Sequence, residues 1–150
     1  MKVDVIAIKK LRELTGAGVA DCRMALEASK GDQKKAVDWL RKKGIEKAEK
    51  KADRQVKAGK VFSYLHHTGR LGAIVSLACE TDFVAKTDDF QNLGKELALH
   101  IAASKPKDVE DLLKQEYVRD PSKTVEELVK EVIGKLGENM QVVEFKIVEV

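Results

Sequence analysis

The sequence predicts an α+β fold: a small three-stranded antiparallel sheet with helices on one face, preceded by a helical N-terminal module. Three observations predict this class. Apolar residues recur at helical spacing over the first part of the chain, the spacing changes to two near its middle, and helical spacing then returns before a last alternating segment. We divide the chain into a three-helix module at residues 1–44, a charged linker at 45–60 and an α+β core at 61–150.

The N-terminal module is predicted to contain three short helices. The first is broken by Gly16 and Gly18, and the second runs from about Val19 to Ser29. The third begins after Asp32, whose side chain suits an N-cap, and we expect it to end at Gly44 as its C-cap. The side chains expected to face inward are Val5, Ile8, Leu11 and Leu14, then Cys22, Ala25 and Leu26, then Ala36, Val37 and Leu40. So short a segment gives a core near the lower limit for independent folding.

The linker at residues 45–60 consists mainly of Lys, Glu, Ala and Asp. It has too few apolar residues for a buried face, so we interpret it as a solvated, partly helical spacer. Its basic residues leave a second interpretation open, which is contact with nucleic acid.

A β-hairpin opens the core. Residues 61–65 and Leu71–Cys79 alternate as strands, and the turn between them contains Gly69. One long helix is expected from Asp82 to about Ser104, with Thr81 or Asp82 as its cap. Phe83 would lie in the first turn of this helix, where a large apolar ring is either a core plug or a wedge for a partner.

The rest of the core completes the sheet and its helical cover. Asp108 to Lys114 suits a short helix, and the sequence from Thr124 to Glu127 is a capping box that starts another. A last strand is expected from Val142 to Val150. The side chains expected to face inward are Leu128, Val132 and Leu136 on the helix, and Val143, Phe145 and Ile147 on the strand. An isolated hairpin is marginal in water, so the fold needs these elements.

Composition favours a protein that acts by binding. Charged residues make up 35% of the 150 residues, and the net charge of +3 does not demand a nucleic-acid partner. No apolar run approaches the ~20 residues of a membrane helix, and the start is too short and polar for a signal peptide. Cys22 and Cys79 lie far apart in different elements, which favours reduced thiols and a cytoplasmic protein. The adjacent His66 and His67 would point to opposite faces of a strand, and we find no catalytic, metal or cofactor site.

Three stretches of this chain resemble the elongation factor Ts family. The first runs from Glu80 to Lys86 (ETDFVAK), the second is residues 11–18 (LRELTGAG) with Asp21-Cys22 and Ala25-Leu26 behind it, and the third is residues 133–140 (IGKLGENM). They occur in the order that the family shows. The resemblance implies a translation elongation factor that is not an enzyme. It would exchange the guanine nucleotide on elongation factor Tu, bind the GDP form, and begin with a three-helix bundle like that of ubiquitin-associated domains.

The resemblance also implies which residues meet the partner. In the family, the Asp and Phe of the first motif press into the nucleotide-binding domain of elongation factor Tu, near its magnesium site, and the second motif docks on a helix of that domain. Many members carry two methionines where this chain has Val19 and Ala20, which bury less apolar area. The implied partner-binding residues are Leu14, Thr15, Gly16, Ala17, Gly18, Val19, Arg23, Thr81, Asp82, Phe83 and Val84.

The chain departs from the family between about Lys105 and Tyr117. Family members usually have tens of residues more in this region, so this chain resembles a minimal version with one copy of the core repeat. Short members of the family pair as dimers, and a three-stranded sheet has exposed edges that are prone to pairing. A homodimer is therefore expected.

Two other functions remain open from the sequence. A ubiquitin-associated-type adaptor would bind an apolar peptide through the N-terminal bundle and would have no exchange activity, but this leaves the corner at Asp82-Phe83 and the stretch from Gly134 to Met140 unexplained. An RNA-binding protein would use the basic residues 47–60. Only four residues are Phe, and stacking platforms are not evident, which counts against single-strand binding.

Overall fold

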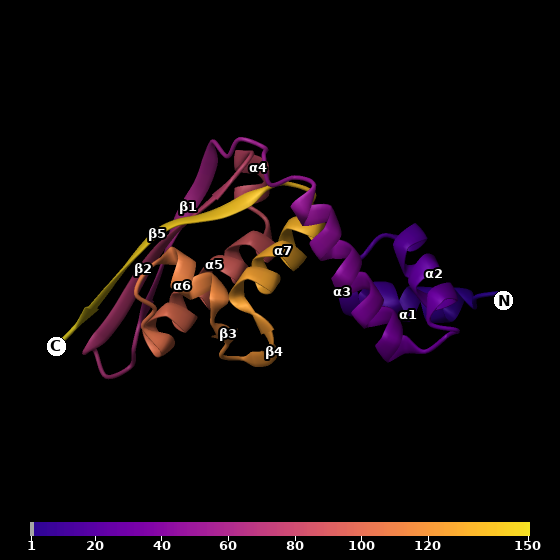
Figure 1. Cartoon of the computed structure of the whole chain (residues 1–150), viewed down its shortest axis with the longest axis horizontal. Helices are drawn as coiled ribbons and strands as arrows, with labels where there is room; N and C mark the ends of the chain where they lie inside the picture. The colour runs from indigo at the N-terminus through magenta and orange to yellow at the C-terminus, as the bar shows by residue number, and fades with distance from the viewer. Residues whose placement is uncertain (1) are drawn as a thin grey trace.

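The computed structural model describes residues 2–150 of the chain. Strands β1 (Ala58–Leu65), β2 (Leu71–Cys79) and β5 (Met140–Glu149) form an antiparallel sheet in the order β1-β2-β5. Helices α5 (Asp88–Ser104), α6 (Val109–Lys114) and α7 (Val125–Leu136) cover one face of this sheet (Figure 1). The short helix α4 (Asp82–Ala85) lies at the end of β2, and β3 (Glu116–Tyr117) pairs with β4 (Asp120–Thr124) in a small ribbon. The α+β class predicted from the sequence is confirmed.

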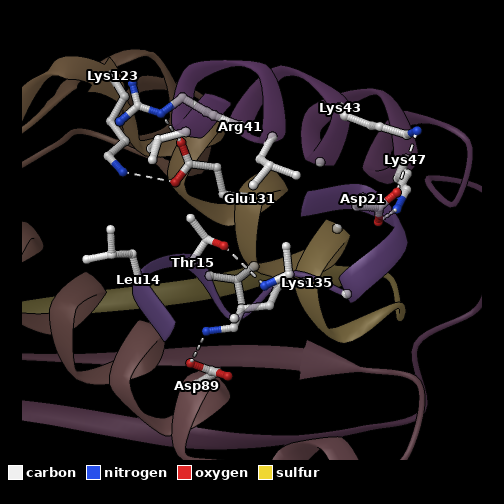
Figure 2. A pocket seen from close by; sticks show the side chains of 18 residues that line it. Leu14, Thr15, Asp21, Arg41, Lys43, Lys47, Asp89, Lys123, Glu131 and Lys135 are labelled. Carbon is white, nitrogen blue, oxygen red and sulfur yellow. Dashed lines mark hydrogen bonds and ion pairs between the residues drawn. The ribbon is translucent and has the colours of Figure 1, made fainter. Parts of the chain in front are cut away.

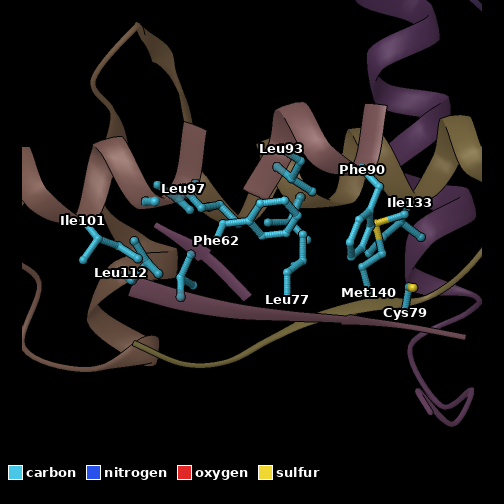
Figure 3. Packing of buried hydrophobic residues seen from close by; sticks show 14 of the residues in the cluster. Phe62, Leu77, Cys79, Phe90, Leu93, Leu97, Ile101, Leu112, Ile133 and Met140 are labelled. Atoms are coloured by element: carbon cyan, nitrogen blue, oxygen red, sulfur yellow. The ribbon is translucent and has the colours of Figure 1, made fainter. Parts of the chain in front are cut away.

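The main core lies between the sheet and α5. Figure 3 shows apolar side chains from both layers meeting there, and Phe62 on β1 and Phe90 on α5 bring their ring centroids within 5.8 Å. The ring of Phe62 occupies the space where a Cβ on Gly94 would lie, so only glycine fits at that position of α5. The buried side chains include Val75, Leu77, Leu93, Leu97, Ile101, Leu112, Ile133 and Met140.

Helices α1 (Val5–Thr15), α2 (Val19–Ala28) and α3 (Gln33–Glu49) form the N-terminal module, at the opposite end of the molecule from the hairpin tip (Figure 1). They enclose a second core of Leu11, Cys22, Ala25, Leu26 and Ala36. Val5 and Leu14, which we expected to face inward, are exposed. The inner stripe of α1 runs through Ala7, Ile8 and Leu11 instead, and Leu14 falls outside it.

The third helix does not end at Gly44, as the sequence suggested. Helix α3 continues to Glu49 and packs against α7. A Cβ on Gly134 of α7 would lie only 2.5 Å from the carbonyl oxygen of Gly44 and 2.6 Å from its Cα. Gly44 is therefore half of a close helix crossing, and nothing in the local sequence distinguishes this use of glycine from a C-cap.

The segment that we interpreted as a spacer is largely structured. Ala48 on α3 is buried in the main core, and β1 begins at Ala58 instead of Val61. Between them, the carbonyl oxygens of Ala52 and Arg54 accept hydrogen bonds from Asn139 of the core. The division of the chain into three parts remains a prediction, but the second part is anchored on the third.

The predicted long helix is two helices. Thr81 caps α4, and Thr87 caps α5 by accepting a hydrogen bond from the amide of Phe90 at 3.3 Å. The break turns Val84 and Ala85 into the core. A second capping threonine so soon after the first is the local signal for this break.

The capping box at Thr124 and Glu127 is present, but α7 is rotated relative to our expectation. Its buried residues are Val125, Val129 and Ile133, whereas Leu128, Val132 and Leu136 are half-buried. This helix is covered by the sheet layer and also by α3, so its apolar stripe is wider than one face.

A β-bulge changes which side chains of β5 face inward. Ser76 pairs with Glu144, but Leu77 pairs with Val142, so the register shifts between them. Val142 is consequently half-buried, and Val143, which we expected on the inner side with Phe145 and Ile147, is exposed.

Where the family was expected to have an insertion, the chain takes a short path through α6. The carboxamide of Gln115 bonds to Nε2 of the buried His100 at 2.8 Å, and the amide of Val118 donates to its Nδ1 at 3.3 Å. The hydroxyl of Tyr117 donates to Glu96 at 2.5 Å. These bonds join the segment to α5.

Candidate functional site

The corner at residues 80–83, where β2 passes into α4, presents an exposed aromatic side chain. Phe83 is 82% exposed, and Asp82 beside it is exposed as well. The next two residues, Val84 and Ala85, are buried and hold α4 against the core. Of the two interpretations that the sequence left open for Phe83, its exposure excludes the core plug.

Val84 has to be taken out of the expected partner surface. Its side chain is 5% exposed and belongs to the main core. The sequence motif places it next to Phe83, but neighbouring residues in a helical turn point about 100° apart, so one can be fully exposed while the other is buried.

Thr81 caps α4 and is itself bound by a distant glutamate. Its hydroxyl oxygen accepts from the amide of Val84 at 3.3 Å and donates to Oε2 of Glu138 at 2.7 Å. The amide of Thr81 donates to the other oxygen, Oε1 of Glu138, at 3.0 Å. Both carboxylate oxygens therefore hold the residue that starts α4.

Asn139 fastens the same corner from the next position. Its amide donates to Oε1 of Glu80 at 3.2 Å, and its side-chain nitrogen donates to the carbonyl oxygen of Arg54 at 2.8 Å. The residue is 3% exposed, so these bonds satisfy a polar group that is buried. Sequence reasoning included Glu138 and Asn139 in the third motif without giving them a role. A possible signal was a polar pair directly between the helix-ending Gly137 and a strand.

Cys79 lies behind the corner. Its thiol donates to the carbonyl oxygen of Thr81 at 3.1 Å. Burial, together with the nearby Glu138 carboxylate, raises the pKa of this thiol, so it stays protonated and acts as a hydrogen-bond donor.

The loop between α1 and α2 presents a second exposed patch. The hydroxyl of Thr15 donates to the carbonyl oxygen of Leu11 at 2.8 Å and accepts from the amide of Ala17 at 3.3 Å, which holds the turn closed. Leu14 and Val19 flank the turn and are 66% and 52% exposed. The loop is therefore both a tight turn between two helices and an exposed apolar surface.

Two charged residues follow on α2. Arg23 is exposed, and among residues 2–150 it forms an ion pair only with Glu27, one turn further along, at 3.1 Å. Such exposed pairs contribute little to stability. Asp21 instead binds Lys47 of α3 at 2.6 Å, and this hydrogen bond lowers the pKa of the Asp21 carboxyl. Arg23 is therefore available to a partner, whereas Asp21 holds α2 on α3.

A groove of about 520 Å³ separates the loop from the core, and Lys135 spans it. Figure 2 shows Lys135 of α7 reaching across the groove to Asp89, with an Nζ–Oδ1 distance of 3.1 Å. The stem of the same lysine fills the space beside Gly16, because a Cβ there would lie 2.5 Å from its Cε. Lys135 thus contacts both the loop and α5, the helix that follows Phe83.

Ion pairs close the other end of the groove. Arg41 of α3 binds Glu131 of α7 at 2.7 Å, and Lys123 binds the same carboxylate at 2.9 Å (Figure 2). The pair of Arg41 with Glu131, together with the crossing of Gly44 and Gly134, fastens the N-terminal module to the core, whereas Lys123 and Glu131 both belong to the core.

Within residues 2–150, no three His, Cys, Asp or Glu side chains are grouped as a metal site would require, and no helix is long and apolar enough to cross a membrane. His66 and His67 do not point to opposite faces of a strand. They follow the end of β1, and their ring centroids lie 4.2 Å apart, because strand alternation no longer applies in the turn.

Comparison with known proteins agrees with the three sequence motifs. The model of the family described as "Elongation factor TS" matches residues 80–150. An elongation factor Ts from Fervidobacterium nodosum is 46% identical over 149 residues, which cover 99% of this chain and 74% of the relative. One from Thermotoga neapolitana is 42% identical and covers 100% of this chain and 98% of the relative. The chain belongs to the elongation factor Ts family.

The protein is therefore a translation elongation factor. The alignment with the Thermotoga neapolitana elongation factor Ts runs over 193 positions, so that relative has residues that this chain of 150 lacks. The part that the family model matches includes the corner, the residues Glu138 and Asn139 that hydrogen-bond to it, and Lys135.

Proposed function

We propose that this protein promotes GDP release from elongation factor Tu in the cytoplasm. The observation that carries the proposal is the exposure of Phe83, 82% of whose surface is open on a corner that is anchored on both sides. Phe83 and Asp82 press into the nucleotide-binding domain of the partner near its magnesium site. No bond is made or broken, so the protein acts by binding alone.

The energetics require more than one contact. Each ~1.4 kcal/mol of coupling between factor and nucleotide changes nucleotide affinity tenfold, and the coupling is reciprocal, so GDP weakens factor binding by the same ratio. Burying one phenylalanine contributes roughly 1.5–3 kcal/mol. Larger effects need a distributed interface, and the patch formed by Leu14, Val19 and the turn between them supports a second contact.

Release of a fluorescent GDP analogue from elongation factor Tu tests the wedge. Catalytic amounts of the wild-type protein should accelerate release, and Phe83→Ala should abolish most of this acceleration at unchanged fold. Val118→Ala is the matched control, because Val118 is also an exposed apolar residue but lies outside both patches. Equal acceleration by Phe83→Ala and the wild-type protein would exclude the wedge. Binding without any acceleration would favour an adaptor.

We also propose that two copies of the chain pair through the open face of the sheet. The helices cover the other face, and this one exposes Val61, Leu65, Ile74, Val143 and Val148. Ile74 lies on the central strand, opposite Ser63 and Lys146. Sedimentation of the wild-type protein should give a dimer, and Ile74→Glu should give a monomer that remains folded. A wild-type monomer at micromolar concentration would contradict this pairing.

A further inference from the structure

We propose that Glu138 is a positioning residue for nucleotide exchange: from the turn between α7 and β5, it completes the capping box that α4 lacks and thereby fixes the direction in which Phe83 leaves the surface. This inference rests on the proposed function, since it concerns the same wedge. It assigns a role to a residue that contacts the corner and lies outside the expected partner surface.

The same protein shows what a complete capping box looks like. At the start of α7, the amide and the hydroxyl of Thr124 both donate to Oε1 of Glu127, each at 3.2 Å. The hydroxyl accepts in turn from the amide of Glu127. The glutamate stands three residues after the threonine, at the position where a capping box requires it.

At the start of α4, that third position cannot hold a glutamate. It is occupied by Val84, which is 5% exposed and anchors the short helix in the main core. A helix of four residues cannot offer both a buried anchor and a capping carboxylate at one position. The amide of Thr81 would therefore have no partner within its own helix.

Glu138 supplies the missing carboxylate from 57 residues further along the chain. It accepts from the same two groups that donate to Glu127 at the start of α7: the amide of Thr81 at 3.0 Å and its hydroxyl at 2.7 Å. Because the hydroxyl donates to Glu138, its lone pair is free to accept from the amide of Val84 at 3.3 Å. The donors and acceptors at Thr81 thus match those at Thr124, except that Glu138 uses both of its carboxylate oxygens where Glu127 uses one.

The hydrogen bonds of Glu138 matter because α4, with four residues, is too short to be stable without contacts to other elements. The first turn of a helix costs more conformational entropy than its hydrogen bonds return, so a single turn is stable only when other contacts fix it. Phe83 has little packing of its own, and its direction depends on Thr81 before it and Val84 after it. If the hydrogen bonds between Thr81 and Glu138 are lost, Phe83 becomes ordered only when the partner binds. The entropy lost in that ordering makes the free energy of binding less favourable.

Exchange measurements with Glu138→Ala test this role. At saturating concentrations of the factor, the maximal rate of GDP release should fall roughly tenfold, as expected when a hydrogen-bonded charged group is removed. Glu138→Gln keeps the shape and one acceptor oxygen, and its rate should lie between those of Glu138→Ala and the wild-type protein. If Glu138→Ala does not fold, Glu138→Gln carries the test.

A double variant separates positioning from general damage. If Glu138 acts through Phe83, adding Glu138→Ala to Phe83→Ala should cause no further loss, because the wedge is already absent. Glu127→Ala is the matched control: it removes the corresponding glutamate from α7 and should lower stability while leaving exchange per folded molecule unchanged.

The outcomes are distinguishable. The inference would be overturned if Glu138→Ala released GDP at the wild-type rate. It would also be overturned if Glu138→Ala lowered the rate by the same factor in the wild-type protein and in Phe83→Ala. In both cases the proposed function would still stand. If the wild-type protein itself did not accelerate GDP release, the proposed function would fail and this inference with it.

Discussion

Phe83 shows how far residue-scale reasoning from the sequence extends. Phe62 and Phe90 are buried, and Phe145, which we expected on the inner side of the last strand, is half-buried. For Phe83, spacing alone allowed both burial and exposure, because the pattern cannot tell where a helix turns at a corner. The resemblance to elongation factor Ts indicated exposure, and the structure confirms that exposure. Its contact with a partner remains a proposal.

His100 predicts a pH dependence of stability at the residue scale. Burial lowers the pKa of His100 below its ordinary value of 6.5, and the hydrogen bond to Gln115 only partly opposes this. Nδ1 accepts from the amide of Val118, so Nε2 carries the proton in the neutral ring. The unfolded chain therefore binds a proton that the folded one resists. Stability should fall as pH drops below about 6.5 and should level off once the folded-state pKa is passed.

Urea unfolding between pH 7.5 and 5 measures this dependence. His100→Gln removes the titrating group and should flatten the profile relative to the wild-type protein. Tyr117, whose ring centroid lies 6.1 Å away, does not interfere, because burial raises the pKa of its hydroxyl far above this range. If the free energy of unfolding changed with pH in the same way in both proteins, protonation of His100 would not destabilise the folded state.

At the scale of elements, the sequence predicted features that depend on neighbouring residues, but it did not predict contacts between segments far apart in the chain. The caps at Asp32 and Thr124 depend on residues within one turn, and the sequence alone located both. The use of Gly44, the role of Glu138 and the bulge that turns Val143 outward each depend on a segment far away in the chain. No periodicity carries that information, so the errors of prediction fall where two elements meet.

Asn139 provides the prediction at this scale. Its side-chain nitrogen joins the end of α3 to the start of β5 through the carbonyl oxygens of Ala52 and Arg54. Asn139→Ala should lower the free energy of unfolding by about 1–3 kcal/mol, because it removes the two hydrogen bonds that this buried side chain donates. Asn92→Ala is the control, since Asn92 is exposed on α5 and its loss should change stability by less than about 0.5 kcal/mol. Equal effects in urea unfolding would show that the bridge to residues 52 and 54 is not stabilising.

For the whole molecule, the two exposed patches belong to one framework. The turn at Gly16 rests against Lys135, the same lysine binds Asp89, and α3 is fixed to α7 where Gly44 meets Gly134. The loop and the corner should therefore reach a partner at a fixed separation, which reduces the entropy lost on binding.

Gly134→Ala tests this framework. The added Cβ would meet the backbone of Gly44 at 2.5 Å, so α3 has to move away from α7. We expect a loss of stability of about 1–3 kcal/mol, typical of overpacking, and a shift of the N-terminal module that small-angle scattering detects. Weaker binding of elongation factor Tu should accompany it, although neither patch is altered.

Glu126→Ala, at an exposed position of the same helix, should leave scattering and binding unchanged. If Gly134→Ala also left both unchanged, the close crossing would not be what sets the separation of the patches. The salt bridge of Arg41 to Glu131 and the contact of the Lys135 stem with the turn at Gly16 would then have to set it.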